Sequence, residues 1–440
     1  MPELLVLANA MFAIVLVVLL VIVVRVHPFI ALLVGPMYLG LSSGLGFVPT
    51  ITAITTGFGE LMGEIGLLIA FGIMIGSFMQ RMGAFQRVVD LLTNRMAPGR
   101  IPYALTGVVT AIFPAIYTDV LLLMATPLAR RIAARMGPEG VPVMAAATSV
   151  GIYLALTLVV PGVGALALAA MLGVDLGTML LFGLIVALPT GFITVFLVTR
   201  LARRGLWDPA LDETTDATEV VDEDVRPISL RMSLLPVLVP IAMIAAGAVD
   251  RALGLGNPML TAVGNSTFAL FVGMVIALLI AKARLPIEVR LDAMSGAFAQ
   301  SGQILLLTGV AGSLSAVVAL TDLGDILSGY FSADTSAPLV LVWLIAAVLH
   351  IAIGSVSASA ITSAALLAPV AQTLGISPVL IALAAGSGAL FLVHVTSNSF
   401  WMMSSLMGLT VRGTLKGLSL PVSLASLVSL PIILLLSTVL

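Results

Sequence analysis

The stretch 101–129 reads IPYALTGVVTAIFPAIYTDVLLLMATPLA, and this apolar run decides how the rest of the chain is arranged. Arg95 lies shortly before it, and Arg130 and Arg131 follow it directly. Because basic residues collect in cytoplasmic loops of membrane proteins, a run with arginine at both ends is expected to enter and leave the bilayer on one side. We therefore predict a re-entrant hairpin that turns within 116–119, where irregular backbone must be covered by protein or line a wet cavity.

The composition places the whole chain in a membrane. Of its 440 residues, 60% are hydrophobic and 9% are charged, and the mean hydropathy is +1.22; in ordinary soluble domains roughly a quarter of the residues is charged. Apolar runs of about 20 residues, enough to cross ~30 Å of hydrocarbon, recur from end to end. The first, Leu4–Val24, lacks the basic start and cleavage site of a signal peptide and is expected to be retained. Cysteine is absent, which excludes thiolate metal sites.

The positions of lysine and arginine orient the other apolar runs. Further spanning helices are expected near 28–45, 63–80, 141–172, 178–199, 233–249, 259–281, 302–320 and 378–395, with a last one after Lys416. A second hairpin is expected near 337–371, entering from the opposite side. With both termini outside, every Lys and Arg except Arg251 then lies in the cytoplasm. We expect a bacterial-type inner membrane protein that crosses the bilayer many times.

An acidic segment, 205–230, separates two halves, 1–204 and 231–440. Eight of the 21 acidic residues lie within it, and a stretch this polar cannot offset its ordering entropy by burial. We therefore expect a cytoplasmic linker that behaves as a mobile loop.

The two halves resemble each other in sequence. Gly57 and Gly63 recur in order as Gly296 and Gly302, and further matches follow at nearly the same offset. Since the orientation of the two halves comes out opposite, we predict an inverted repeat of the kind found in secondary transporters. The expected fold is an all-α polytopic membrane protein with two inverted-topology repeats, about ten spanning helices and two re-entrant hairpins.

Polar or helix-breaking residues occur at matched places in the two halves, and the binding site is expected there. The hairpin tips carry Tyr117, Thr118 and Asp119 in the first half, and Ser355, Ser357, Ser359 and Thr362 in the second. Two later helices are interrupted, one at Pro161 and Gly162 and the other at His394, Thr396, Ser397 and Asn398. Backbone amides freed at such breaks can hold a carboxylate, and freed carbonyls and hydroxyls can hold Na⁺. These residues are predicted to bind a small organic anion.

Asp119 is the one charged residue deep within an apolar run. A charge at that depth is costly, so we expect it to carry the coupling ion; the alternative is a neutral carboxyl bonded to nearby backbone. His394 is a second candidate for proton transfer, with a structural hydrogen bond as its alternative. Since no Lys or Arg lies inside the apolar runs, backbone amides and hydroxyls are expected to bind the anion.

Several of these motifs resemble the gluconate permease (gluconate:proton symporter) family of the ion transporter superfamily. The glycine-rich stretch 57–83, Asp119 with the following run to Pro-Leu, the Gly-Ser segment 354–364 and His394-Val395 with Phe400-Trp401 carry the resemblance. It implies proton-coupled uptake of sugar acids or related hydroxy acids. Two motifs depart from the family pattern: Val160 stands in place of a histidine, and 396–399 reads Thr-Ser-Asn-Ser without the family's acid.

Three other functions remain open on the residues alone. An antiporter or channel would use Asp119 as a cation site, a carboxylate transporter could be coupled to Na⁺, and an intramembrane protease would pair Asp119 with Asp325. The protease is disfavoured because Asp325 is expected at the outer surface rather than at membrane depth. Neither H-E-x-x-H nor a nucleotide-binding G-x-x-x-x-G-K-[ST] motif is present, so no enzymatic activity, cofactor or ATP use is expected. The expected partners are the organic anion with H⁺ or Na⁺, the lipid bilayer and a second copy in a homodimer, with no nucleic acid.

Overall fold

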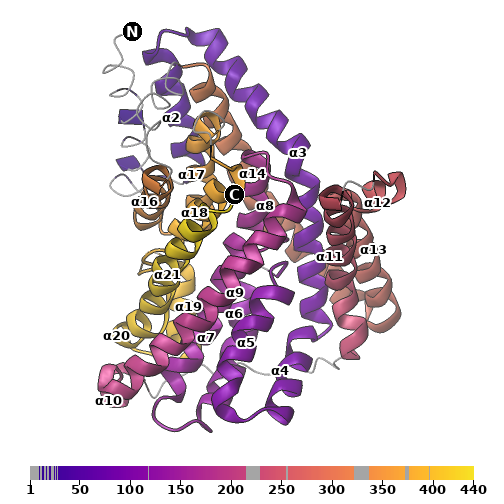
Figure 1. Ribbon diagram of the computed structural model, residues 1–440, viewed down its shortest axis with the longest axis vertical. Helices are drawn as coiled ribbons and strands as arrows, with labels where there is room; N and C mark the ends of the chain where they lie inside the picture. Colours follow the sequence, from indigo (N-terminus) through magenta and orange to yellow (C-terminus); the bar gives the residue numbers. More distant parts are fainter. Residues whose placement is uncertain are drawn as a thin grey trace.

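The computed structural model describes residues 28–116, 118–214, 228–253, 256–321, 336–371, 376–395 and 397–440, with isolated positions before residue 28. These residues form helices joined by short connections, and their one β-type pairing is an isolated bridge between Glu213 and Leu409 (Figure 1). The expectation of an all-α fold is confirmed for this part of the chain. The expected first helix, 4–24, falls largely outside it.

The helices are named in chain order, with 1–204 called the first half and 231–440 the second half. The first half contains α2 (Pro28–Ser42), α3 (Phe47–Arg81), α4 (Ala84–Arg95), α5 (Ile101–Ile112), α6 (Thr118–Ala133), α7 (Gly140–Leu158), α8 (Val163–Met171) and α9 (Leu176–Leu201). After the short α10 (Pro209–Asp212) come α11 (Leu230–Leu253), α12 (Pro258–Val263), α13 (Ser266–Arg284), α14 (Ile287–Ala319), α16 (Ser336–Ile353), α17 (Val356–Ala371), α18 (Pro378–Gly388), α19 (Asn398–Met407), α20 (Val411–Thr414) and α21 (Leu420–Leu436). Among the described residues five segments are long and apolar enough to cross a membrane, or six with the bent α3.

Several helix boundaries differ from the sequence-based expectation; for example, the helix expected at 302–320 begins at Ile287. The helix expected at 63–80 begins at Phe47. The threonines and glycines of 50–59 lower the local hydropathy, but they lie within the helix, which bends by 48° before Gly66. The helix expected at 378–395 ends at Gly388, although the following residues are apolar. Apolar character alone does not separate a helix from a buried non-helical segment.

The longest helices, α3 and α14, pack against each other along most of their length (Figure 1). The hydroxyl of Ser313 donates to the carbonyl of Ile54 at 2.8 Å, and that of Ser77 donates to the carbonyl of Ala293 at 2.7 Å. Numbers rise on one helix as they fall on the other, so the pair is antiparallel. A Cβ at Gly57 would lie 2.5 Å from α14 backbone, so glycine allows this close approach.

The run 101–129 forms two short helices that point in opposite directions. Thr106 and Thr110 of α5 donate to the carbonyls of Ala147 and Gly151 of α7, at 3.0 and 3.3 Å, so α5 and α7 run parallel. The next helix, α6, is joined to α7 by a short turn and packs along it in the reverse direction. The start of α5 and the end of α6 therefore lie at the end of the molecule where α7 begins.

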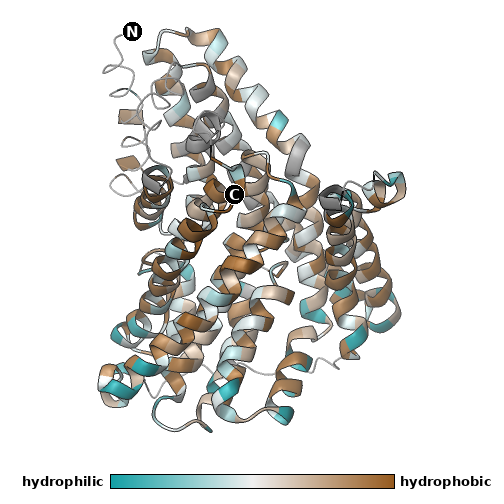
Figure 2. Cartoon of the chain, viewed as in Figure 1, coloured by the Kyte–Doolittle hydropathy of each residue, from teal (hydrophilic) through white to brown (hydrophobic). Residues whose placement is uncertain are grey.

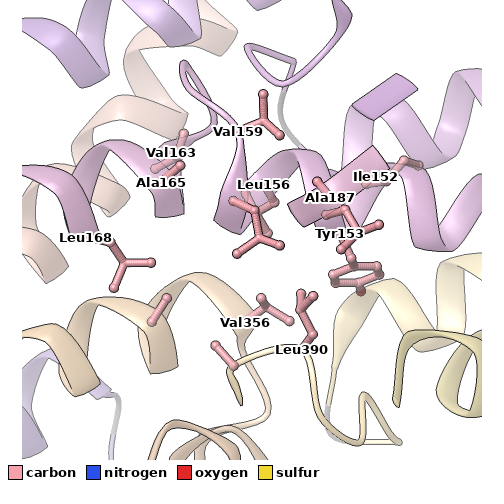
Figure 3. Packing of buried hydrophobic residues seen from close by; sticks show 14 of the residues in the cluster. Ile152, Tyr153, Leu156, Val159, Val163, Ala165, Leu168, Ala187, Val356 and Leu390 are labelled. Carbon is pink, nitrogen blue, oxygen red and sulfur yellow. The ribbon is translucent and has the colours of Figure 1, made fainter. Parts of the chain in front are cut away.

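The centre of the molecule is built from α7, α8 and α18, which are buried almost throughout. A helix that is apolar on every side is stable only when other helices surround it. Figure 3 shows Leu156 of the first half facing Val356 and Leu390 of the second, and all three belong to one buried cluster. Hydrophilic residues gather at the end of the molecule that carries α4 and α10 (Figure 2).

The beginning of the acidic segment is ordered, which corrects the expectation of a mobile loop for residues 205–214. Asp212 is fully buried, and its carboxylate lies 2.6 Å from Lys416 Nζ and 3.1 Å from Arg412 Nε. The backbone N–H of Thr410 donates to the carbonyl of Asp212 at 3.0 Å. These contacts fasten α10 to α20, so the expected linker begins as part of the folded second half.

Candidate functional site

A carboxylate from the first half meets the start of a helix from the second half. Asp119 lies in the first turn of α6, and the side chains of Asn398 and Ser399, in the first turn of α19, each donate to one of its oxygens at 2.9 Å. Both helix N-termini carry partial positive charge, so this place suits an anion. The hydrogen bonds join residues 279 and 280 positions apart.

The broken segment before α19 is fastened to α16 by two histidines. His350 Nδ1 is 2.8 Å from the carbonyl oxygen of Phe391, and His394 Nε2 is 3.1 Å from that of Ile351. Trp401 Nε1 donates to the carbonyl of Val395 at 2.8 Å. Because ring nitrogens satisfy backbone carbonyls that no helix can pair, the segment 389–395 keeps a defined path before α19.

The matching break in the first half lies between α7 and α8. Pro161 and Gly162 are buried, and a Cβ at Gly162 would collide with the carbonyl of Ala155. Glycines of α3 pass close to both breaks of the first half: Gly72 lies beside the Pro161 carbonyl, and Gly76 touches the backbone before Asp119. A Cβ at Gly76 would collide with the carbonyl of Ala115 and displace the segment before Asp119, whereas a Cβ at Gly72 would make ordinary contact at 3.7 Å from the Pro161 carbonyl.

The tip of the second hairpin lies between α16 and α17. There the side chain of Ser355 is exposed and that of Ser357 is partly exposed, whereas Ser359 and Thr362 are buried. The Ser359 hydroxyl donates to the Ser355 carbonyl at 2.6 Å. The hairpin packs against α8 through α17, just as α6 packs against α19. Each helix that follows a predicted hairpin tip thus contacts a helix that follows a break in the other half.

The structure brings together part of the predicted set. Asp119 and Asn398 are in contact, with Thr118 and Ser397 buried beside them in the chain, while Tyr117 and Thr396 lie outside the described residues. The hydrogen bonds described for Ser355 and Ser359 stay within their own turn. Among the described residues no group of three His, Cys, Asp or Glu is placed to hold a metal.

Two residues of this arrangement were not among the predicted site residues. Ser399 was placed in the broken segment, but its hydroxyl reaches Asp119 because it occupies the first turn of α19. Gly76 lies within the glycine-rich stretch, and it allows the backbone of Ala115 and Ile116 to pack directly against α3. From the sequence, Ser399 can be recognised as part of a polar cluster. Nothing in the sequence indicates that Gly76 contacts the backbone before Asp119.

Comparisons with known proteins agree with the resemblance drawn from the motifs. A family model described as GntP family permease matches residues 5–439. The chain is 30% identical to the D-serine transporter DsdX of Escherichia coli, with 97% of this chain and 96% of that one covered. It is 27% identical to the gluconate permease of Bacillus subtilis (94% and 95%) and 28% identical to the Gnt-II system L-idonate transporter of Escherichia coli (92% and 93%).

Solved structures of membrane transporters share the fold. The Alcanivorax borkumensis YdaH transporter matches with a TM-score of 0.63 at 19% identity, covering 93% of this chain and 97% of that one. Neisseria gonorrhoeae MtrF matches with a TM-score of 0.61 at 15% identity, covering 90% and 85%. At these identities the likeness concerns the arrangement of helices.

Proposed function

Since this chain belongs to the GntP family of permeases, we propose that it is a symporter that carries a small organic acid into the cell together with protons. The observation that carries the proposal is the contact of Asp119 with Asn398 and Ser399, where two helix N-termini meet. Its relatives are named permeases and transporters, which sets aside the protease pairing of Asp119 with Asp325; Asp325 itself lies outside the described residues.

We propose that the cargo is a carboxylate with a hydrogen-bonding group on the adjacent carbon. Gluconate, L-idonate and D-serine, named for three relatives, share a carboxylate beside a carbon that bears a hydroxyl or an amino group. The amides and hydroxyls around the first turn of α19 suit the carboxylate, and Ser355 and Ser357 at the opposite hairpin suit the substituents. Sugar acids and other hydroxy acids fit this description, as does a hydroxy amino acid.

The helix order supports an inverted repeat. α2 and α3 correspond to α13 and α14 in order and length, and the series α5 to α9 corresponds to α16 to α21. The antiparallel packing of α3 on α14 is what two equivalent helices of opposite orientation would produce. We infer about ten spanning helices, two re-entrant hairpins, external termini and alternating access between the halves in an inner membrane; assembly as a homodimer remains a prediction.

The proposed coupling follows from the charge on Asp119. As a carboxylate, Asp119 occupies the donors of Asn398 and Ser399 and repels a second anion. Protonation removes that charge and releases the donors, so a substrate carboxylate can take the same place at the N-terminus of α19. Proton and organic anion would therefore bind together, and each proton would accompany one carboxylate. His394 could pass the proton, or it could hold the segment before α19.

The test is uptake by proteoliposomes that contain the purified chain. Labelled gluconate and labelled D-serine are added under an imposed inward proton gradient with Na⁺ absent throughout. We expect one of them to accumulate above the external concentration. Accumulation only with an inward Na⁺ gradient would replace the proton by Na⁺, and ion flux without uptake of any acid from a carboxylate panel would favour the antiporter. The acids for that panel are chosen by a thermal-shift screen of the purified chain. A ligand at 100 times its Kd stabilises the folded protein by about 2.7 kcal/mol, which the screen detects.

A further inference from the structure

A basic pocket lies away from the Asp119 site, at the arginine-rich end of the molecule. Its volume is about 530 Å³, and it is formed by the start of α5, the turn between α6 and α7, and the end of α9. Four arginines and one glutamate line it: Arg135, Arg200, Arg203, Arg204 and Glu139. Arg203 Nε donates to Glu139 at 3.1 Å, so the charges of the other three arginines are not balanced within the pocket.

An exposed apolar strip of α9 leads into this pocket. Phe192, Phe196 and Arg200 follow one another at steps of four residues, which places them on one face of the helix. The two phenylalanines are 42% and 51% exposed, and the Arg200 guanidinium lies 5.9 Å from the centre of the Phe196 ring. Further along α9, Leu181 and Ile185 are also exposed, at 56% and 42%. Since α9 is long and apolar enough to cross a membrane, the strip is placed to face lipid.

We propose that this pocket binds the phosphate headgroup of an anionic phospholipid, with an acyl chain lying along Phe192 and Phe196. Guanidinium groups pair with phosphate oxygens in a two-pronged geometry, and basic pockets between membrane helices hold anionic headgroups. Inorganic phosphate would offer the same anionic group, but it has no apolar part that could contact Phe192 and Phe196. The bound lipid joins the open end of the first hairpin to α9, because residues of both line the pocket.

The experiment uses the full chain in detergent and compares three additives: phosphatidylglycerol, phosphatidylcholine and inorganic phosphate. Thermal unfolding is followed as each is titrated, and lipids retained by the protein are identified by native mass spectrometry. The test variant is Arg200→Gln with Arg204→Gln, and Arg200→Lys with Arg204→Lys keeps the charge. The matched control, Arg95→Gln with Arg284→Gln, removes two exposed arginines that do not line the pocket.

We expect phosphatidylglycerol to stabilise the wild-type chain and the control equally, with phosphatidylcholine and phosphate inactive. The glutamine variant should bind phosphatidylglycerol roughly 30-fold more weakly, since two basic groups near the headgroup are lost, and the lysine variant should lie between. Stabilisation by inorganic phosphate at equal strength would assign the pocket to a soluble anion and overturn the lipid. Equal loss in the control, or no difference between the two lipids, would overturn the site.

Discussion

At the scale of single residues, Asp119 differs from Asp250 in what surrounds it. Asp250, which is buried whereas Asp119 is partly exposed, accepts hydrogen bonds from the backbone N–H of Asn257 and the hydroxyl of Thr261, and these hold the turn between α11 and α12 together. Asp119 instead receives its two donors from the opposite half of the chain. A carboxylate that joins the two halves can respond when they move relative to each other, whereas Asp250 acts within one corner.

Asp119→Asn is expected to abolish accumulation driven by a proton gradient. The amide resembles the protonated acid, so the variant should still exchange labelled substrate across the membrane but no longer tie that movement to a proton. Uptake and exchange by proteoliposomes measure the two properties. Asp90→Asn, in an exposed position of α4, serves as the matched control. If the Asp119→Asn variant still accumulates substrate with unchanged pH dependence, Asp119 has a structural role and does not carry the coupling proton.

A pair of substitutions distinguishes the two possible roles of His394, which are proton transfer and positioning of the segment before α19. His394→Gln keeps an N–H that can reach the Ile351 carbonyl, whereas His394→Leu removes a hydrogen bond worth about 1 kcal/mol. If His394 positions the segment before α19, the glutamine variant retains proton-driven uptake with the wild-type pH profile and the leucine variant loses most of it. Loss of proton-driven accumulation in both variants, with exchange intact, would place His394 on the proton path.

At the scale of helices, the breaks were more predictable than the ends. Helices are interrupted at Pro161-Gly162 and at Gly354-Ser355, as predicted from the sequence. Proline lacks a backbone N–H and glycine adopts conformations that other residues avoid, so both disfavour a continuous helix in any context. The start of α3 at Phe47 was not predicted, since its threonines and glycines resemble a loop by hydropathy. The end of α18 at Gly388 was also not predicted, because residues after it are held by contacts with α16 that are distant in sequence.

The docking of α10 on α20 gives a stability prediction. Asp212→Asn leaves Lys416 and Arg412 without their buried counter-charge, which costs about 3 kcal/mol. Thermal unfolding in detergent should show a clear fall in melting temperature. Asp292→Asn is the control, because its ion pair with Arg81 is largely exposed and is worth at most about 1 kcal/mol. Equal effects of the two substitutions would show that Asp212 adds nothing beyond a surface pair.

At the scale of the whole molecule, contacts between the halves could be predicted only as a possibility. The predicted repeat puts the two predicted hairpins at matched positions, and likewise the two breaks, but it does not say which of these elements contact each other. That α6 contacts α19 and α17 contacts α8 depends on how the halves pack. The pairing of Asp119 with Asn398 follows from this packing, so the sequence predicted a polar cluster but not which of its residues contact each other.

The orientation of the first hairpin can be tested because the chain has no cysteine of its own. Gly99, Arg135 and Arg200 line one pocket, so the start of α5 and the end of α6 lie at one end of the molecule. Arg95→Cys and Arg135→Cys should therefore both resist an impermeant thiol reagent in intact cells and both react once the membrane is opened. Met259→Cys, 75% exposed in α12 and expected outside, should react in intact cells. Labelling of Arg95→Cys or Arg135→Cys from outside would refute a hairpin that opens to the cytoplasm, and labelling of only one of them would mean that the run 101–129 crosses the bilayer.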